Sequence, residues 1–315
     1  MARTMYDAVA VGDAILDVVT PPLPPGVGDR QSHVERFSYI PGGNATNFAL
    51  AFAALGGRTA LAACIGRDWA GSVLRGAFRR GGVDAHLRLS PTKPTGMTFA
   101  LTFSDGTRRL VTSLGANADL RPSDVPTSWI GRTRHVHRAG YWWATRLIGP
   151  PTKRLLQRAR AAGATTSLDV STDPLGWPQH RRDAVLSVLP HVDIFFGNEE
   201  EVRALAGVEE PTQAAKELCR RGVGAVVVHR GARGARYIAG SAMHEARAYR
   251  VPADNPTGCG DVFNAGFVRS RLLGRDIPEA LRFANASAAL HLRDRSRPYP
   301  YSRSVMDFLR SAASL

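Results

Sequence analysis

Short apolar runs alternate with longer segments of helical periodicity along most of the chain. The apolar runs predict strands over residues 7–11, 59–65, 135–139, 166–170, 192–196 and 225–229. The helical spacing predicts helices over residues 46–55, 68–80, 151–162, 180–189, 199–206 and 212–221, followed by 259–273, 277–292 and 304–313. Such alternation is typical of a mostly parallel sheet with helices on both faces. The predicted fold class is therefore α/β, a three-layer αβα sandwich.

Two segments interrupt this alternation. Residues 18–40 begin with a proline-rich stretch, PPLPPG, and continue into an extended run, FSYI. Residues 83–113 contain several short apolar runs around the turn signal Ser104-Asp105-Gly106. We expect both segments to leave the main sheet together and to form a small β lid. The sequence has no internal repeat, so residues 1–315 are predicted to form one α/β domain that carries this lid.

The composition is that of an ordinary globular protein. Of the 315 residues, 44% are apolar and 22% are charged, which argues against disordered and fibrous classes. No apolar run approaches the ~20 residues of a membrane-spanning helix, and aspartates interrupt the N-terminal segment before a signal-peptide core could form. The three cysteines have no metal-like spacing. We therefore expect a soluble, cytoplasmic protein without a disulfide framework.

The charge balance is strongly basic, with 41 lysine and arginine residues, 27 acidic residues and a net charge of +14. Phosphate neutralisation dominates nucleic-acid affinity, so such a balance can mark a nucleic-acid-binding protein. The basic residues are scattered, however, and no base-stacking or groove-reading module is recognisable. We expect neither a nucleic acid nor a membrane as partner, and we expect solvated arginines that attract anionic substrates.

The strongest local signal lies at residues 254–266, which read DNPTGCGDVFNAG and precede an apolar helical pattern. Gly258 and Gly260 allow backbone N–H groups to converge at a helix N-terminus, where the partial positive charge favours an anion. Asp261 would repel a phosphate there unless it had a catalytic task, and accepting the proton of an attacking hydroxyl group is such a task. A simple helix cap is the alternative that this segment alone leaves open.

A second signal lies at residues 41–47, which read PGGNATN. Paired glycines let the backbone approach a ligand closely, and the amides of Asn44 and Asn47 suit hydroxyl groups. A turn followed by a capped helix explains this segment equally well. Asp13 and Asp17 follow the first predicted strand, where a carboxylate can accept two vicinal hydroxyl groups or can simply shape a turn.

Together these segments resemble the ribokinase-like carbohydrate kinases of the PfkB family. In that family a di-glycine sugar-binding segment precedes a D-T-x-G-A-G-D segment. Three further segments are similar to family landmarks, namely GRDWAG at residues 66–71, NEEE at residues 198–201 and RGARG at residues 230–234. They match the family's G-x-D-x-x-G loop, N-x-x-E motif and G-x-x-G nucleotide loop. The resemblance covers almost the whole chain and implies a ribokinase-like fold.

The resemblance implies roles for individual residues. Asp261 matches the catalytic base, and Gly258, Cys259 and Gly260 match the anion hole for the transferred phosphoryl group. The residues that match the sugar site are Asp17, Gly42, Gly43, Asn44 and Asn47, with Asp13 on the same loop. The residues that match the nucleotide site are Asn198, Gly231, Gly234 and Asn285, and Glu201 is implied as a ligand of Mg²⁺ through water.

Three departures from the family pattern affect the details. Asn255 replaces an aspartate of a monovalent cation site, so K⁺ is implied by the family but its carboxylate ligand is changed here. Cys259 replaces a common alanine. Trp142 and Trp143 stand where some members place a polar sugar contact. Their rings could stack on a sugar or a nucleobase, and Trp142 is assigned to the substrate site, but a buried cluster at a strand end explains them equally well.

The activity that the resemblance implies is ATP-dependent phosphorylation of a hydroxyl group, the primary one, on a sugar or polyol. A nucleoside kinase of the same family is the alternative, because the scaffold also accepts ribose that bears a base. A catalytically silent binding protein is a third reading, against which the presence of Asp261 and its neighbouring glycines argues. The chain lacks a lysine-bearing phosphate loop, which excludes the P-loop NTPases. Lids of this family often pair, so a homodimer through the lid is expected.

Overall fold

The six strands predicted from apolar runs all belong to one large sheet of nine strands. The computed structural model describes residues 4–25, 31–105, 107–252, 257–294 and 299–312. The strands of the large sheet are β1 (Ala8–Val11), β4 (Thr59–Ile65), β5 (Asp84–Leu89), β8 (His135–Arg138), β9 (Thr165–Asp169), β10 (Ile194–Asn198), β11 (Ala225–His229), β12 (Ala235–Ala239) and β13 (Ala242–Ala246). Their order is β13-β12-β11-β10-β9-β8-β1-β4-β5, and only β12 and β13 run antiparallel to their neighbours.

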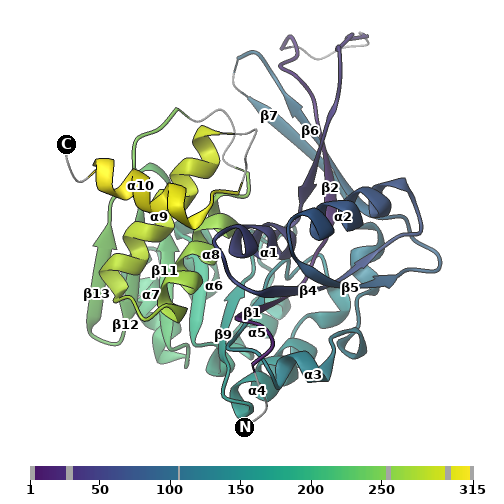
Figure 1. Cartoon of the computed structure of the whole chain (residues 1–315). Helices are drawn as coiled ribbons and strands as arrows, with labels where there is room; N and C mark the ends of the chain where they lie inside the picture. Colours follow the sequence, from purple (N-terminus) through teal and green to yellow (C-terminus); the bar gives the residue numbers. More distant parts are fainter. Residues whose placement is uncertain (1–3, 26–30, 106, 253–256, 295–298, 313–315) are drawn as a thin grey trace.

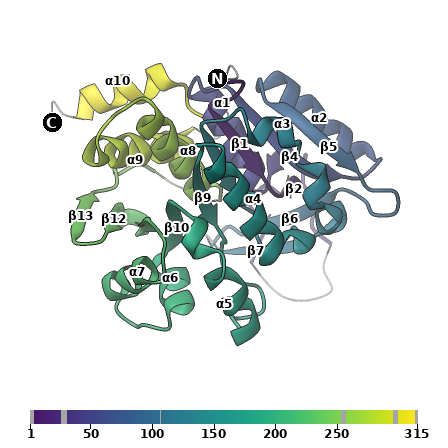
Figure 2. The ribbon, with the colours of Figure 1, turned by 90° about the horizontal axis from the view of Figure 1, so that it is seen from below.

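Helices cover both faces of this sheet (Figures 1 and 2). They are α1 (Asn44–Ala54), α2 (Trp69–Arg80), α3 (Thr127–Ile130), α4 (Pro150–Ala161), α5 (Gln179–Leu186), α6 (Glu199–Ala206), α7 (Pro211–Arg220), α8 (Cys259–Leu272), α9 (Ile277–Arg293) and α10 (Ser302–Ala312). Successive side chains of a strand point to opposite faces. Accordingly, Ala8 and Ala10 of β1 pack in the core under α1 and α8, whereas Val9 and Val11 pack in the core under α4 and α6. The predicted three-layer α/β class is confirmed.

A second sheet of four strands projects from the large sheet (Figure 1). Its strands are β2 (Ile15–Val19), β3 (Ser38–Gly42), β6 (Gly96–Thr102) and β7 (Arg108–Ser113), in the order β3-β2-β6-β7. We call it the small sheet. The assignment of all of residues 83–113 to a lid is wrong for β5, which pairs with β4 in the large sheet. Ala85, Leu87 and Leu89 alternate toward the core there, which explains the difference.

The carboxyl ends of the parallel strands meet at one edge of the large sheet. β9, β10 and β11 end at Asp169, Asn198 and His229, and Asp13 follows β1. Ligands of open α/β sheets bind outside this edge, so the topology gathers polar side chains where a site is expected.

Within the described part of the chain, no helix combines the length and the apolar character needed to cross a bilayer. The cytoplasmic location and the exclusion of nucleic acid stay predictions.

Candidate active site

A carboxylate from a distant part of the sequence holds the N-terminus of α1. Asp13 is fully buried, and its oxygens accept hydrogen bonds from the backbone N–H groups of Ala45 (2.9 Å) and Asn44 (3.1 Å). The helix cap is Gly43, whose φ of 96° suits glycine and which has no side chain to satisfy these donors. Asp13 also lines the smaller cavity described below, but both of its oxygens accept hydrogen bonds from the start of α1.

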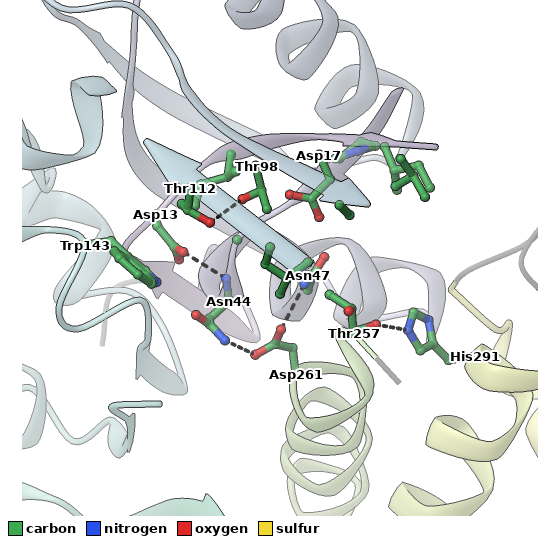
Figure 3. Close-up of a pocket in the computed structure, with 18 of the residues that line it drawn as sticks. Asp13, Asp17, Asn44, Asn47, Thr98, Thr112, Trp143, Thr257, Asp261 and His291 are labelled. Carbon is green, nitrogen blue, oxygen red and sulfur yellow. Dashed lines mark hydrogen bonds between the residues drawn. The ribbon is translucent and has the colours of Figure 1, made fainter. Parts of the chain in front are cut away.

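The first turn of α1 in turn holds Asp261 (Figure 3). Asn44 Nδ2 donates to Oδ1 of Asp261 at 3.0 Å, and Asn47 Nδ2 donates to Oδ2 at 2.9 Å. The hydroxyl group of Tyr299 donates to Oδ1 of Asn47 at 2.9 Å, which is consistent with the orientation of this amide. Both carboxylate oxygens of Asp261 therefore face α1.

Asp261 lies in the first turn of α8 and is only 4% exposed. Burial raises the pKa of its carboxyl group well above the usual value, and the nearby carboxylate of Asp169 raises it further. The amides of Asn47 and Asn44 oppose this rise because they favour the ionised form. A general base works best when its pKa lies near the operating pH. Burial and the two amides shift the pKa of Asp261 in opposite directions, so a change in either one adjusts that pKa.

The glycines before Asp261 allow α1 and α8 to approach. Gly258 caps α8 with a φ of 80°, and a Cβ atom there would lie 3.1 Å from Nδ2 of Asn47. A side chain at this position would push against the amide that holds Asp261. Cys259 is the first residue of α8 and is half-buried beside Gly260. The three residues predicted as an anion hole thus stand at the N-terminus of α8, where the helix dipole favours an anion.

A cavity of about 220 Å³ lies between the small sheet and the N-termini of α1 and α8 (Figure 3). Asp17 on β2, Thr98 on β6 and Thr112 on β7 line its small-sheet wall, and the opposite wall carries Asn47 and Asp261. Of the predicted sugar-binding residues, Asp13, Asp17, Gly43, Asn44 and Asn47 line this cavity. Gly42 does not line the cavity. It packs so closely against the Asp17 carboxylate that a Cβ atom at this position would lie 2.3 Å from it.

The two adjacent tryptophans have different environments. Trp142 is 2% exposed and packs in the core, where its Nε1 donates to the carbonyl oxygen of Ser171 at 3.2 Å and the guanidinium of Arg181 lies 4.2 Å from its ring. Trp143 lines the 220 Å³ cavity. The assignment of Trp142 to the substrate site is therefore wrong in this structure, since the turn after β8 directs Trp142 into the core and Trp143 toward the cavity.

A larger cavity of about 700 Å³ lies on the other side of Asp261. Its lining includes all the residues predicted for the nucleotide and for Mg²⁺, namely Asn198, Glu201, Gly231, Gly234 and Asn285. Asn285 Nδ2 donates to the carbonyl oxygens of Ala246 and Arg247, at 3.0 and 3.1 Å, and so braces the chain at the cavity wall. Asn44, Gly258 and Asp261 line both cavities, so the two cavities meet at the carboxylate of Asp261.

Sequence reasoning missed a buried network under the larger cavity. Asn264 Nδ2 donates to Oδ2 of Asp169 at 2.7 Å, and Oδ1 of Asn264 lies 2.9 Å from Nε2 of His229. Asn264 is one helical turn after Asp261, and Asp169 ends β9 at the same sheet edge as Asp13. An aspartate at the end of a predicted strand was the signal that could have found this network.

Glu201 and Asn198 form a capping box at the start of α6. The side chain of Asn198 accepts from the backbone N–H of Glu201 (2.8 Å), and the carboxylate of Glu201 accepts from the N–H of Asn198 (2.9 Å). Burial and then the Asp169 carboxylate raise the pKa of Glu201 to about 7. Oxygen donors of this kind suit Mg²⁺.

Among the described residues, no three histidine, cysteine or acidic side chains are close enough together to bind a metal ion directly. Asn255, the residue in question for K⁺, lies outside the described residues.

A family model described as pfkB family carbohydrate kinase matches residues 5–299. The chain belongs to this family. The predicted activity class, phosphoryl transfer from ATP to a hydroxyl group of a sugar, is thereby confirmed at the level of the family.

Individual relatives cover most of the chain. A 2-dehydro-3-deoxygluconokinase of Thermoproteus tenax is 29% identical over 98% of this chain and 96% of its own length. A nucleoside kinase of Methanothermobacter thermautotrophicus is 29% identical over 91% of this chain and 90% of its own. A ribokinase II-type structure from E. coli with ATP and Mg²⁺ superposes with a TM-score of 0.87 at 23% identity, over 98% of this chain and 100% of its own, and shares the fold.

Replacing the Asn47 amide should change the pH dependence of catalysis. In Asn47→Leu one oxygen of Asp261 loses its hydrogen bond, so the pKa of Asp261 rises further and this expected base stays protonated to higher pH. We expect the acid limb of the kcat profile to move up by about one pH unit. Thr112→Val changes the same cavity without touching Asp261 and should leave the acid limb in place. An unchanged limb in a folded Asn47→Leu protein would contradict this account.

Proposed function

We propose that the protein transfers the γ-phosphoryl group of ATP to a primary hydroxyl group of a sugar or polyol. The observation that carries this proposal is the position of Asp261, which lines both cavities and stands at the N-terminus of α8. The acceptor would occupy the 220 Å³ cavity and the nucleotide the 700 Å³ cavity. The attacking oxygen and the γ-phosphorus would then meet beside a carboxylate and a set of backbone N–H groups.

In this mechanism the acceptor is oriented by Asp17 and by the hydroxyl groups of Thr98 and Thr112, which lie 3.1 Å from each other. As the acceptor oxygen bonds to the γ-phosphorus, its proton passes to Asp261 and the bond from the γ-phosphorus to the departing ADP oxygen breaks. The N–H groups at Gly258 to Gly260 stabilise the charge on the transferred group. Positioning and preorganised electrostatics supply most of the rate enhancement.

Mg²⁺ would be held beside the phosphates by Glu201, through water, with Asn198 completing the turn that presents this carboxylate. When bound, Mg²⁺ neutralises charge on the phosphate oxygens. A carboxylate that reaches the metal through water suits Mg²⁺, which keeps several of its own water ligands. A K⁺ site near Asn255 stays a prediction.

We also propose that the small sheet acts as a lid and as a dimer interface. Its inner face, including Thr98 and Thr112, lines the acceptor cavity. Strand alternation places Phe99 and Val111 on the other face, where they are 46% and 55% exposed. An apolar face of this kind is typical of an interaction surface, and a second copy of the chain would cover it.

Light scattering tests the dimer. We expect the native protein to have twice the chain mass at micromolar concentration and Phe99→Asp to have the mass of one chain, because a buried unpaired charge opposes association. Met243→Asp, at an equally exposed apolar position on β13, should stay dimeric. A monomeric native protein at these concentrations would rule the interface out.

A nucleoside is the second candidate acceptor, because Trp143 lines the acceptor cavity and an indole ring can stack on a base. Coupled detection of ADP release over a panel of sugars, inositols and nucleosides separates the two candidates. We expect fastest turnover with a sugar or polyol, and loss of turnover when its primary hydroxyl group is removed. Preference for a nucleoside over every sugar would favour the alternative, and ADP release that no acceptor stimulates would refute a kinase of either kind.

The role of Asp261 is tested with Asp261→Asn in the same assay. The amide cannot accept the proton, so we expect turnover to fall by ~10² to 10⁴. The folded-state pKa of Asp261 is raised, so ionisation of this group destabilises the fold as pH rises through that pKa. At neutral pH the variant loses the cost of a buried charge, but its NH₂ group faces one of the two amide donors of α1, so its resistance to urea should lie close to that of the native protein. Asp307→Asn on the exposed face of α10 is the matched control. Near-normal turnover in folded Asp261→Asn would refute the assignment.

A further inference from the structure

His291 is a buried polar residue of the smaller cavity, and the mechanism above assigns it no role. It stands in the last turn of α9, is 4% exposed and lines the 220 Å³ cavity. Its Nε2 atom lies 2.9 Å from the carbonyl oxygen of Thr257, just before the start of α8 (Figure 3). A side chain of α9 therefore binds the backbone that leads into the predicted anion hole.

The partner of His291 determines which nitrogen of the ring carries a hydrogen. A carbonyl oxygen can only accept, so Nε2 must donate. The neutral ring with its hydrogen on Nε2 and the charged ring both provide this donor, so the contact does not depend on the charge of the ring. A Cβ atom on Gly258 would lie 3.4 Å from Nε2, and the ring of Tyr299 stacks on the imidazole at a centroid distance of 6.2 Å. This packing holds the donor in one place.

The hydrogen bond to Thr257 also orients the N–H group of Gly258. The two groups belong to one peptide unit, which is planar and trans, so its C=O and N–H bonds point in opposite directions. Because the oxygen points toward α9, the N–H points away from α9. Gly258 lines both cavities, and its φ of 80° is one of the backbone angles that change when this peptide unit rotates. Fixing the peptide unit therefore fixes the turn by which the chain enters α8.

The same layer of side chains supports the carboxylate of Asp261. The hydroxyl group of Tyr299 donates to Oδ1 of Asn47 at 2.9 Å, and Nδ2 of Asn47 donates to Asp261 at 2.9 Å. The stacked rings of His291 and Tyr299 thus contact both the chain before α8 and the first turn of α1. His291 acts on the backbone N–H groups, and Tyr299 acts on the amide that holds the proposed base.

We propose that His291 is a positioning residue for phosphoryl transfer. It holds the peptide unit between Thr257 and Gly258 so that the N–H of Gly258 meets the transferred phosphoryl group without rearrangement. The inference rests on the proposed kinase function. A donor that is already oriented costs no reorganisation as charge develops on the phosphoryl oxygens, so it stabilises the transition state more than either bound substrate. Without the hydrogen bond the peptide unit can rotate, and part of that stabilisation is lost.

Steady-state kinetics with ATP and the best acceptor of the panel test the proposal. His291→Leu cannot donate, so we expect kcat to fall ~10- to 100-fold. The KM values of ATP and of the acceptor should each stay within about threefold of the native values, because the lost interaction belongs to the transition state. His291→Gln can place an amide N–H near the position of Nε2 and should restore kcat to within about threefold of the native value. His180→Leu, at an exposed position on α5, is the control and should match the native protein.

Nitrogen-15 NMR of the histidine side chains tests the hydrogen bond without any turnover. We expect the resonances that His291→Gln removes to be those of a ring protonated at Nε2, whether neutral or charged. A neutral ring with its hydrogen on Nδ1 would overturn this inference and leave the proposed kinase function untouched.

Two kinetic outcomes would also overturn the inference alone. One is an unchanged kcat in folded His291→Leu, and the other is an equal loss of kcat in folded His291→Leu and His291→Gln. Urea unfolding shows whether each variant folds. If His291→Leu does not fold, His291→Asn, whose side chain is too short to reach Thr257, takes its place. A native protein that releases no ADP in response to any acceptor would overturn the kinase function itself, and this inference with it.

Discussion

The pairing of two helix N-termini around one buried carboxylate is the constraint on which the rest of the site depends. Asp261 sits on α8 with almost no exposure to solvent, and its ionised form is costly in that environment. Two amides from the first turn of α1 provide compensating hydrogen bonds. Because Asp13 binds the backbone of that turn, a carboxylate that follows β1 indirectly positions the proposed base. The site therefore forms only when the sheet, α1 and α8 are all in place.

The residues proposed for phosphoryl transfer and those proposed to recognise the acceptor lie on different elements of the fold. The residues around the transferred group come from α1, α8 and the carboxyl edge of the large sheet, which are packed on both cores. The acceptor wall comes from the small sheet, where alternate residues such as Thr98 and Leu110 face the cavity. A substitution in that wall changes the shape and polarity offered to the acceptor without moving Asp261. A family with one catalytic geometry can in this way accommodate different acceptors.

The sequence predicted elements and motifs whose signals are local. Buried strands and amphipathic helices have their own periodicity, and the segment around Asp261 carries its glycines beside it. Trp142 and Trp143 could not be distinguished, because a turn whose geometry is tertiary decides which ring is buried. The network of Asp169, Asn264 and His229 was missed for a similar reason. Its members lie 95 and 35 residues apart, and none of them carries a motif of its own.

Asp13, Asp261, Asp169 and Glu201 line the active-site cavities, which raises the question of how an enzyme for anionic nucleotides tolerates such a site. Each carboxylate is engaged locally: Asp13 by backbone N–H groups, Asp261 by amides, Asp169 by Asn264 and Glu201 by a capping box. Hydrogen bonding of this kind stabilises a buried charge without supplying a counterion. Binding of a polyphosphate then brings more negative charge to the same place, where Arg250 of the larger cavity is a cation of the chain itself. A divalent metal held beside Glu201, as proposed, would add positive charge at the phosphates that the free protein need not stabilise in advance.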